Sequence, residues 1–248
     1  MKILSIGNSF SQDAQRWLHN IATVDNFELD TYNLFIGGCS LETHWQNIEN
    51  NALAYSFEGN NGRFIKTVSI EDALNEYDYD IITLQQASGD SGKPQTFFPY
   101  IQKIAEYVRA KQPQAKLYFH MTWSYEIGAQ HGHYYRYNND SKEMFRRISD
   151  CAEMASKIFD IPIIPVGKFI QYLRENTEVF DYINGGLSLC RDGFHLSETY
   201  GRFAAASVWY KTLTGKKVKA ENFIKENEGF DAEIVDIIIE KLEEFSQQ

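Results

Sequence analysis

Short apolar runs alternate with longer amphipathic segments along almost the whole chain. Segments whose apolar residues recur every three or four positions predict helices, whereas short runs bounded by glycine, proline or polar turns predict strands. The runs that we assign to core strands cover residues 2–6, 27–36, 80–86, 115–121 and 161–166. Because strands that alternate with helices form a mostly parallel sheet covered on both faces, the pattern predicts an α/β fold built around five strands.

Helices are predicted between these strands and after the last of them. They cover residues 12–21, 41–53, 70–77, 97–111, 140–159, 167–175, 196–213 and 231–245. Residues 54–57 and 63–69 instead flank Glu58-Gly-Asn-Asn-Gly62, which has the composition of a hairpin turn, so 54–69 is predicted as a small antiparallel insertion. Since no linker divides the chain, we expect one domain over residues 1–248, with 216–248 as an acidic helical extension.

The composition allows a large core and narrows the range of partners. Hydrophobic residues make up 43% of the 248 residues, and the formal net charge is −10. A nucleic-acid interface needs a basic patch, and no basic run supplies one, so no nucleic-acid partner is expected. No apolar stretch reaches 18 residues, so no membrane span is expected.

The terminus and the cysteines add little further chemistry. The first apolar run is too short for a signal peptide and leads directly into a turn, so we expect a cytoplasmic protein, or an exported one if a signal was removed from a longer precursor. Cys39, Cys151 and Cys190 are odd in number and far apart, which argues against a disulfide framework. His131-Gly-His133 has no carboxylate cluster beside it, so no metal is expected.

The first candidate for chemistry lies in the turn Gly7-Asn8-Ser9, between the first strand and the first helix. In an open α/β sheet, ligands bind where strands end and helices begin. A serine hydroxyl at this place is a candidate nucleophile, and its own backbone N–H could hold an oxyanion. The alternative is structural, because Ser9 and Gln12 also fit a capping box.

The second candidate is Asp192-Gly-Phe-His195, which precedes the last large helix. A carboxylate that accepts the Nδ1–H of the imidazole would fix its tautomer and leave Nε2 as a general base. The alternative is an Asx-type turn that leads into a helix capped by Ser197.

Together, these two segments resemble the SGNH/GDSL hydrolases, over residues 2 to about 213. In particular the chain looks like an uncharacterised bacterial branch with Gly-Asn-Ser-Phe-Ser near the start and Leu-Gln-Gln in the middle. The resemblance implies a flavodoxin-like three-layer α/β/α fold. It also implies a triad in which Ser9 is the nucleophile, His195 the base and Asp192 the orienting acid.

The resemblance also implies donors for the oxyanion. Gly38, in the Gly-Gly pair after the second strand, matches the family's oxyanion glycine, and its N–H would act with that of Ser9. The alternative for this pair is a plain strand-to-helix turn. The family's side-chain donor is an asparagine in Gly-x-Asn, where this chain has Gln85-Gln86-Ala87-Ser88. We expect Gln86 to replace it, with Gln85 as second choice, unless both glutamines only satisfy loop backbone.

The loop over residues 122–139 is long, aromatic and rich in histidine. Loops of this length usually have a function, and aromatic faces suit sugar rings or acyl chains. We expect a wall of the substrate cleft formed by Trp123, Tyr125, His120, His131 and His133, with Phe10 and Trp45 near the mouth of the cleft. The alternative is a loop that only packs over the sheet edge.

By this resemblance, the expected function is hydrolysis of an O-acetyl or other short acyl ester, carried by a carbohydrate or another small molecule. This reaction needs no cofactor, so none is expected. Two alternatives stay open. One is a flavodoxin-like module that binds a phosphate or nucleotide at the Gly-Asn-Ser turn. The other is an inactive homologue that binds acylated glycans. The natural ester and the oligomeric state do not follow from the sequence.

Overall fold

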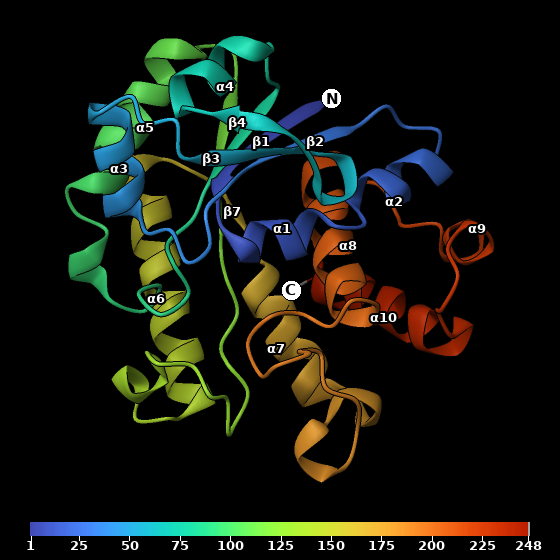
Figure 1. The fold of residues 1–248 in the computed structure, drawn as a ribbon. Coiled ribbons are helices and arrows are strands. Elements are labelled where there is room, and N and C mark those ends of the chain that lie inside the picture. Colours follow the sequence, from blue (N-terminus) through green and yellow to red (C-terminus); the bar gives the residue numbers. More distant parts are fainter. Residues whose placement is uncertain (248) are drawn as a thin grey trace.

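The computed structural model describes residues 1–247 and places seven strands in one sheet, in the order β4-β3-β2-β1-β5-β6-β7 (Figure 1). The strands are β1 (Lys2–Gly7), β2 (Asp30–Phe35), β3 (Tyr55–Gly59), β4 (Arg63–Val68), β5 (Ile81–Leu84), β6 (Lys116–His120) and β7 (Ile163–Ile164). From β2 to β7 every neighbouring pair is parallel. The predicted mostly parallel α/β sheet is therefore confirmed.

The predicted number of five strands is wrong, because the hairpin insertion joins the main sheet. β3 pairs antiparallel with β2, and β4 pairs antiparallel with β3. The turn between them is the short 3₁₀ segment η1 (Asn60–Gly62), in which Asn61 and Gly62 have φ values of 64° and 73°. Turn chemistry predicted the hairpin itself. The hairpin extends the main sheet because β3 pairs with the free edge of β2, and the sequence of the turn does not show this pairing.

The helices follow the predicted positions with a few changes. They are α1 (Ser9–Gln15), α2 (Leu18–Val24), α3 (Leu41–Glu49), α4 (Ile70–Glu76), α5 (Tyr100–Lys111), α6 (Ser141–Phe159), α7 (Val166–Asn176), α8 (Tyr200–Thr214), α9 (Ala220–Glu226) and α10 (Ala232–Phe245). The helix predicted over 12–21 is broken at Arg16–Trp17, and α9 is an additional helix within the predicted C-terminal extension, ahead of the helix expected over 231–245. Gln248, at the end of the expected C-terminal extension, lies outside the described residues.

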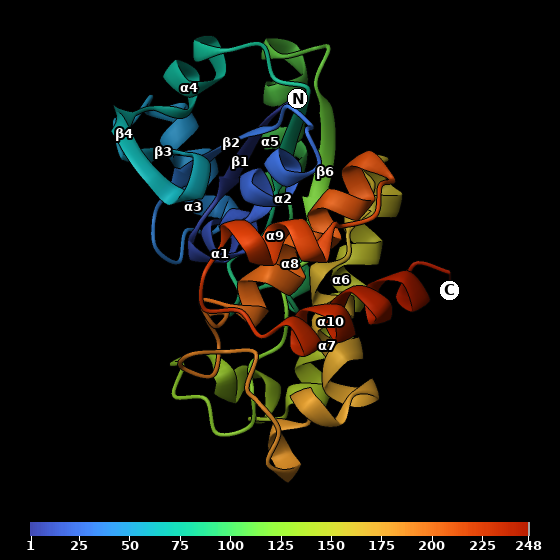
Figure 2. The ribbon, with the colours of Figure 1, turned by 90° about the vertical axis from the view of Figure 1, so that its right-hand side faces the viewer.

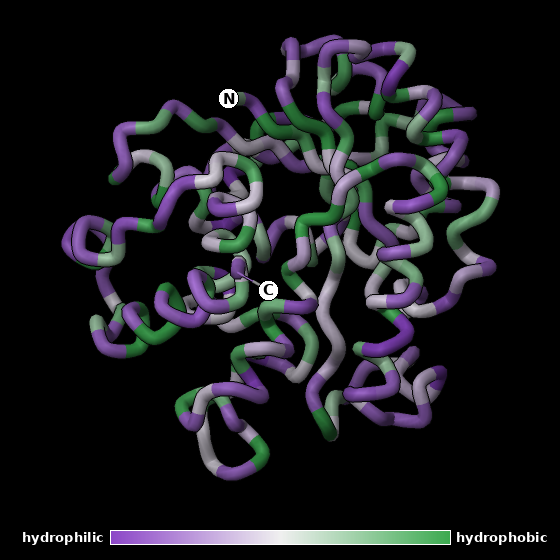
Figure 3. Tube along the Cα trace, turned by 180° about the vertical axis from the view of Figure 1, so that it is seen from behind, coloured by the Kyte–Doolittle hydropathy of each residue, from purple (hydrophilic) through white to green (hydrophobic). Residues whose placement is uncertain are grey.

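Helices cover both faces of the sheet. α3, α4 and α5 pack together on one side, whereas α1 and α2 pack against α8 on the other (Figure 1). α10 packs over α8 and contacts α9, as Figure 2 shows from the side of these helices. The hydrophobic stretches run through the middle of the molecule, and many peripheral turns are hydrophilic (Figure 3). Within the described residues, none of the helices is long and apolar enough to cross a membrane.

Candidate active site

Ser9 lies at the carboxyl end of the central strand β1, as the first residue of α1. The N-cap of this helix is Asn8, whose Oδ1 accepts a hydrogen bond of 2.9 Å from the N–H of Phe10. Asn8 forms the capping box with Ser11, so the predicted alternative of a box from Ser9 to Gln12 is wrong. Since Asn8 satisfies the helix start, the hydroxyl of Ser9 is free for another partner.

That partner is His195, which comes from a loop 186 residues further along the chain. The Nε2 of His195 lies 2.9 Å from the Oγ of Ser9, and its Nδ1 lies 2.7 Å from Oδ2 of Asp192. Because an ionised carboxylate only accepts, Nδ1 carries the proton and Nε2 can accept the hydroxyl proton of Ser9. The three side chains expected from the sequence are therefore in line.

The Asp192–His195 segment is also an Asx-type turn, so the two sequence interpretations hold together. Oδ1 of Asp192 accepts from the N–H of Phe194 at 3.1 Å and from the N–H of His195 at 2.7 Å. Burial opposes ionisation of Asp192, but the hydrogen bonds from His195 and Phe194 outweigh it and hold its pKa below the ordinary value. The carboxylate is therefore charged at neutral pH. The N-cap of α8 is Thr199, and the hydroxyl of Ser197 accepts from the N–H of Gly201 in the first turn of that helix.

Among residues 1–247, two backbone N–H groups, one after β1 and one after β2, have no hydrogen-bond partner. In the described part of the chain, the N–H of Ser9 and that of Gly38 make no hydrogen bond. Gly38 is exposed with φ of 65°, and no atom lies within 4 Å of where a Cβ would be. The next residue, Cys39, is tied to the start of α1, because its carbonyl accepts from Nδ2 of Asn8 at 3.1 Å. Both groups are thus available to a ligand oxygen.

Gln86 does not offer a third donor in this arrangement, contrary to our expectation. Its Nε2 donates to the carbonyl and the hydroxyl of Thr96, at 2.9 and 3.1 Å. Its Oε1 accepts from the N–H groups of Leu41 and Ala87. The alternative, in which the glutamine satisfies loop backbone, therefore describes Gln86.

The side-chain amide of Gln85, the second choice, is occupied by two hydrogen bonds near Ser9. Its Nε2 donates to Oδ1 of Asn8 at 2.7 Å, and its Oε1 lies 2.9 Å from Nδ1 of His120. Side chains at the carboxyl ends of β1, β5 and β6, namely Asn8, Gln85 and His120, are thereby linked next to the turn that carries Ser9. Gln85 therefore holds the turn from below.

The predicted cleft wall is wrong for Trp123, Tyr125 and His120, because all three side chains are fully buried. The ring of Trp123 stacks on Phe10 with centroids 4.3 Å apart, and its Nε1 donates to the carbonyl of Phe194 at 2.7 Å. Trp123 therefore supports the Asp192–His195 turn from the inside, which is closer to the alternative of a packing loop. Burial lowers the pKa of His120 to about 3, so its ring is neutral.

The other aromatic residues of this prediction have mixed positions. Phe10 is buried, and its ring centroid lies 5.9 Å from that of His195. Trp45 is partly buried and lies under the ammonium of Lys103 instead. His131 is partly exposed and packs against Phe194 with ring centroids 4.8 Å apart. Burial, followed by the nearby His133 and His195, lowers the pKa of His131.

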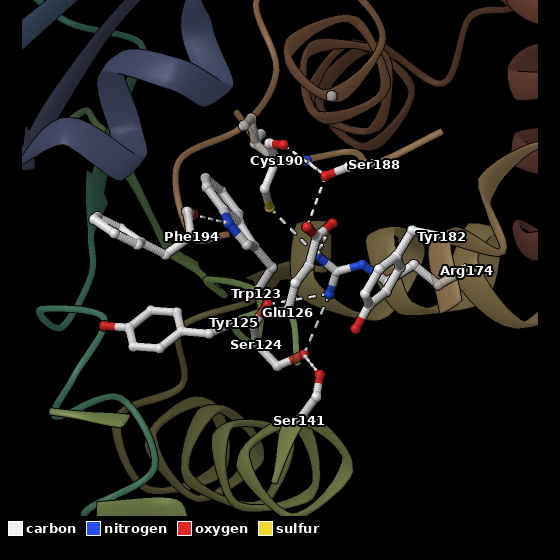
Figure 4. A network of polar contacts seen from close by, with 12 residues as sticks. Trp123, Ser124, Tyr125, Glu126, Ser141, Arg174, Tyr182, Ser188, Cys190 and Phe194 are labelled. Carbon is white, nitrogen blue, oxygen red and sulfur yellow. Dashed lines mark hydrogen bonds and ion pairs between the residues drawn. The ribbon is translucent and has the colours of Figure 1, made fainter. Parts of the chain in front are cut away.

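A buried ion pair lies behind the same turn (Figure 4). Nη2 of Arg174 donates to Oε1 of Glu126 at 3.2 Å, and both side chains are less than 10% exposed. Oε2 of Glu126 accepts from the hydroxyl of Ser188 at 2.6 Å, and the N–H of Glu126 donates to the carbonyl of Gly193 at 2.8 Å. The segment around Glu126 therefore holds the loop that carries His195 at two points.

Two hollows adjoin this region without containing the triad. One of about 430 Å³ is lined by His131, Tyr135 and Asn139, among others. The second, of about 680 Å³, shares Asn139 and extends to Arg174 and Tyr182. Both volumes fall in the range of small-molecule sites. Among residues 1–247, no group of three or more histidine, cysteine or acidic side chains is arranged to hold a metal ion.

Three solved structures with this fold are described as hydrolases or esterases. A putative SGNH hydrolase from Slackia heliotrinireducens has 20% identity and a TM-score of 0.59, over 86% of this chain and 98% of that one. The lipase/acylhydrolase from Enterococcus faecalis has 14% identity and a TM-score of 0.54, over 88% and 97%. The psychrotrophic esterase EstA from Pseudoalteromonas sp., with a structure inhibited by monoethylphosphonate, has 9% identity and a TM-score of 0.55, over 86% and 97%. The chain therefore has the SGNH/GDSL hydrolase fold, as the sequence motifs predicted.

Within this fold, the chain belongs to the family described as a domain of unknown function, DUF4886, whose model matches residues 2–234. A member of that family from Bacteroides uniformis has 34% identity and a TM-score of 0.87, over 100% of this chain and 96% of that one. No curated protein matches the chain.

Proposed function

We propose that this protein is a serine esterase that uses Ser9, His195 and Asp192. The observation that carries the proposal is the pair of distances at His195, 2.9 Å to the hydroxyl of Ser9 and 2.7 Å to the carboxylate of Asp192. A hydroxyl, an imidazole and a carboxylate in this order convert an alcohol into a nucleophile. The side chain of His195 is 24% exposed, so a substrate can reach it from outside.

The reaction takes two steps at the same residues. His195 takes the proton of Ser9 as Oγ forms a bond to the ester carbonyl carbon, and the negative oxygen accepts from the N–H groups of Ser9 and Gly38. The C–O bond to the alcohol then breaks, and His195 protonates the leaving oxygen. Water, deprotonated by His195, attacks the acyl-enzyme, and the free acid leaves as the proton returns to Ser9. No cofactor takes part in these steps.

We propose an O-acetyl or other short acyl ester of a carbohydrate as the substrate. The exposed turn at Gly38 leaves room for a bulky alcohol group next to Ser9. The adjoining hollow offers His131, the exposed ring of Tyr135 and the amide of Asn139. Aromatic faces with nearby polar groups are suited to sugar rings.

The test is turnover of p-nitrophenyl acetate by the purified protein. Ser9→Ala is expected to reduce kcat at least ~10³-fold, because the nucleophile is lost. His195→Ala is expected to be nearly as damaging, and the double variant little worse than either single variant, because the two residues act as one unit. Ser149→Ala, on the surface of α6, serves as the matched control and should keep full activity.

A fluorophosphonate probe separates the proposed esterase from the alternatives. Covalent labelling that disappears in Ser9→Ala supports a working nucleophile. The phosphonate-inhibited neighbour EstA gives a precedent for this chemistry on the fold. A folded protein that neither labels nor turns over p-nitrophenyl acetate would contradict the proposal and leave both alternatives, phosphate or nucleotide binding and glycan binding without cleavage.

A further inference from the structure

A fully buried carboxylate lies on the helix that carries Ser9. Asp13 is one turn further along α1, and its side chain is 0% exposed. Nη1 of Arg191 donates to both of its oxygens, at 3.1 and 3.2 Å, and Nε of Arg202 donates to Oδ1 at 2.8 Å. The N–H of Leu196 donates to Oδ2 at 2.9 Å. A buried charge persists only when it is paired and hydrogen-bonded, so these contacts are a structural requirement for Asp13.

The partners of Asp13 bracket the proposed catalytic turn. Arg191 directly precedes Asp192, and Leu196 directly follows His195. The two ends are also joined to each other, because the N–H of Arg191 donates to the carbonyl of His195 at 2.9 Å. One carboxylate on α1 therefore fixes both ends of the turn that must present Nε2 to Ser9.

We propose that Asp13 is a positioning residue for the triad, an inference that rests on the proposed esterase function. Among the described residues, Asp13 makes no hydrogen bond or ion pair with the three reacting side chains, but it determines where the turn of Asp192 and His195 lies relative to the helix of Ser9. Displacing reacting groups by about 1 Å can reduce a rate on the order of 10²-fold. Loss of this carboxylate should therefore reduce kcat more than it weakens substrate binding.

The chain offers a matched control in Asp25, at the end of α2. Asp25 also pairs with cations, but at the other end of α8. It forms ion pairs with Lys216 at 3.1 Å and Lys219 at 2.5 Å, and it accepts a hydrogen bond from the hydroxyl of Tyr210. It is a carboxylate that ties the same two parts of the chain together, but it does not contact the triad turn. Any effect of lost stability alone should appear in both variants.

The experiment compares Asp13→Asn with Asp25→Asn. Asparagine keeps the size and one acceptor but removes the charge that faces both arginines. We expect Asp13→Asn to reduce kcat for p-nitrophenyl acetate at least ~10-fold at a temperature well below its Tm, with KM changed less than about twofold. Labelling of Ser9 by the fluorophosphonate should slow in parallel. Asp25→Asn should lower Tm while keeping kcat.

Variants of Arg191 test the same contact from the more exposed side, where a folding failure is less of a risk. Its side chain is 33% exposed. Arg191→Met should lower kcat, and Arg191→Lys should restore part of it because one cation returns. A folded Asp13→Asn with unchanged kcat, or an equal loss in Asp25→Asn, would overturn the positioning role. An inactive and unlabelled natural protein would instead overturn the esterase proposal itself.

Discussion

At the scale of single residues, the Asp192–His195 turn contains a glycine, Gly193, whose place a larger residue would fill only with strain. Gly193 has φ of 86°, in the left-handed region that other residues rarely adopt. A Cβ there would lie 2.9 Å from the Cβ of Ala129 and 3.0 Å from its Cα. The turn therefore needs glycine for its backbone angle and also for its contact with the loop of Ala129.

Gly193→Ala is expected to destabilise the protein and to impair turnover, because strain and a clash act on the proposed triad turn. Gly128→Ala is the control, since Gly128 has φ of 87° but nothing within 4 Å of a Cβ. We expect about 1 kcal/mol of lost stability for Gly128→Ala, and roughly 2–4 kcal/mol with a lower kcat for Gly193→Ala. Urea unfolding and p-nitrophenyl acetate turnover measure the two effects, and equal losses in both variants would contradict the role of the contact.

The residues that the structure brings together as expected and those that it does not differ in the reach of their side chains. Ser9, Asp192 and His195 occupy short turns whose local geometry limits where each side chain points. Gln86 has a long side chain with two donors and two acceptor sites, and it forms hydrogen bonds with Thr96, Leu41 and Ala87. Only the packed loops determine which of these partners a glutamine meets.

At the scale of elements, the start of α1 is tied to the neighbouring strands by the side chain of Asn8. Its Oδ1 caps the helix and accepts from Gln85 of the loop after β5, and its Nδ2 donates to the carbonyl of Cys39 after β2. His120, at the end of β6, joins this hydrogen-bond network through Oε1 of Gln85. The turns that follow three parallel strands are thus held together by amide and imidazole groups under Ser9.

Asn8→Ala should cost considerably more stability than an ordinary cap. Loss of the cap costs about 1 kcal/mol, and leaving the amide of Gln85 buried without its acceptor adds roughly 1–3 kcal/mol. Asn50→Ala is the control, because Asn50 ends α3 at the surface and bonds only the carbonyl of Gln46 through its side chain. It should cost roughly 0.5 kcal/mol. Chemical denaturation of the two variants measures the difference, and similar losses would show that the link to Gln85 adds nothing.

At the scale of the whole molecule, helices on both faces of the sheet enclose two neutral histidines. His44 on α3 and His120 at the end of β6 are both 0% exposed, and burial lowers the pKa of each to about 3. Their Nε2 atoms have no hydrogen-bond partner among the described residues, as expected for rings that carry no second proton. Enclosure by the sheet and its helices therefore makes the protein sensitive to acid.

The stability of the protein should fall as the pH drops below about 6.5, the ordinary pKa of histidine. Below that pH the two histidines bind protons in the unfolded chain but stay neutral in the folded protein. Their contribution to the free energy of unfolding is therefore complete above pH 6.5 and is lost as the pH falls. Each buried histidine contributes a slope of about 1.4 kcal/mol per pH unit. His120→Asn keeps a donor for Gln85, and it should reduce the slope between pH 5 and 6.5 by about that amount. Urea unfolding across this range measures it, and an unchanged slope would show that His120 is protonated in the fold.

The sequence by itself determined the alternation of strands and helices, the position of Ser9 after the first strand and the Asp192–His195 turn. These features depend on periodicity and on turn chemistry within a few residues, which folding elsewhere does not alter. Tertiary structure alone decided that the hairpin extends the sheet, that Trp123, Tyr125 and His120 are buried, and that Asp13 holds the turn of His195. Each of these depends on groups far apart in the chain, whose contacts arise only when sheet edges and helices pack.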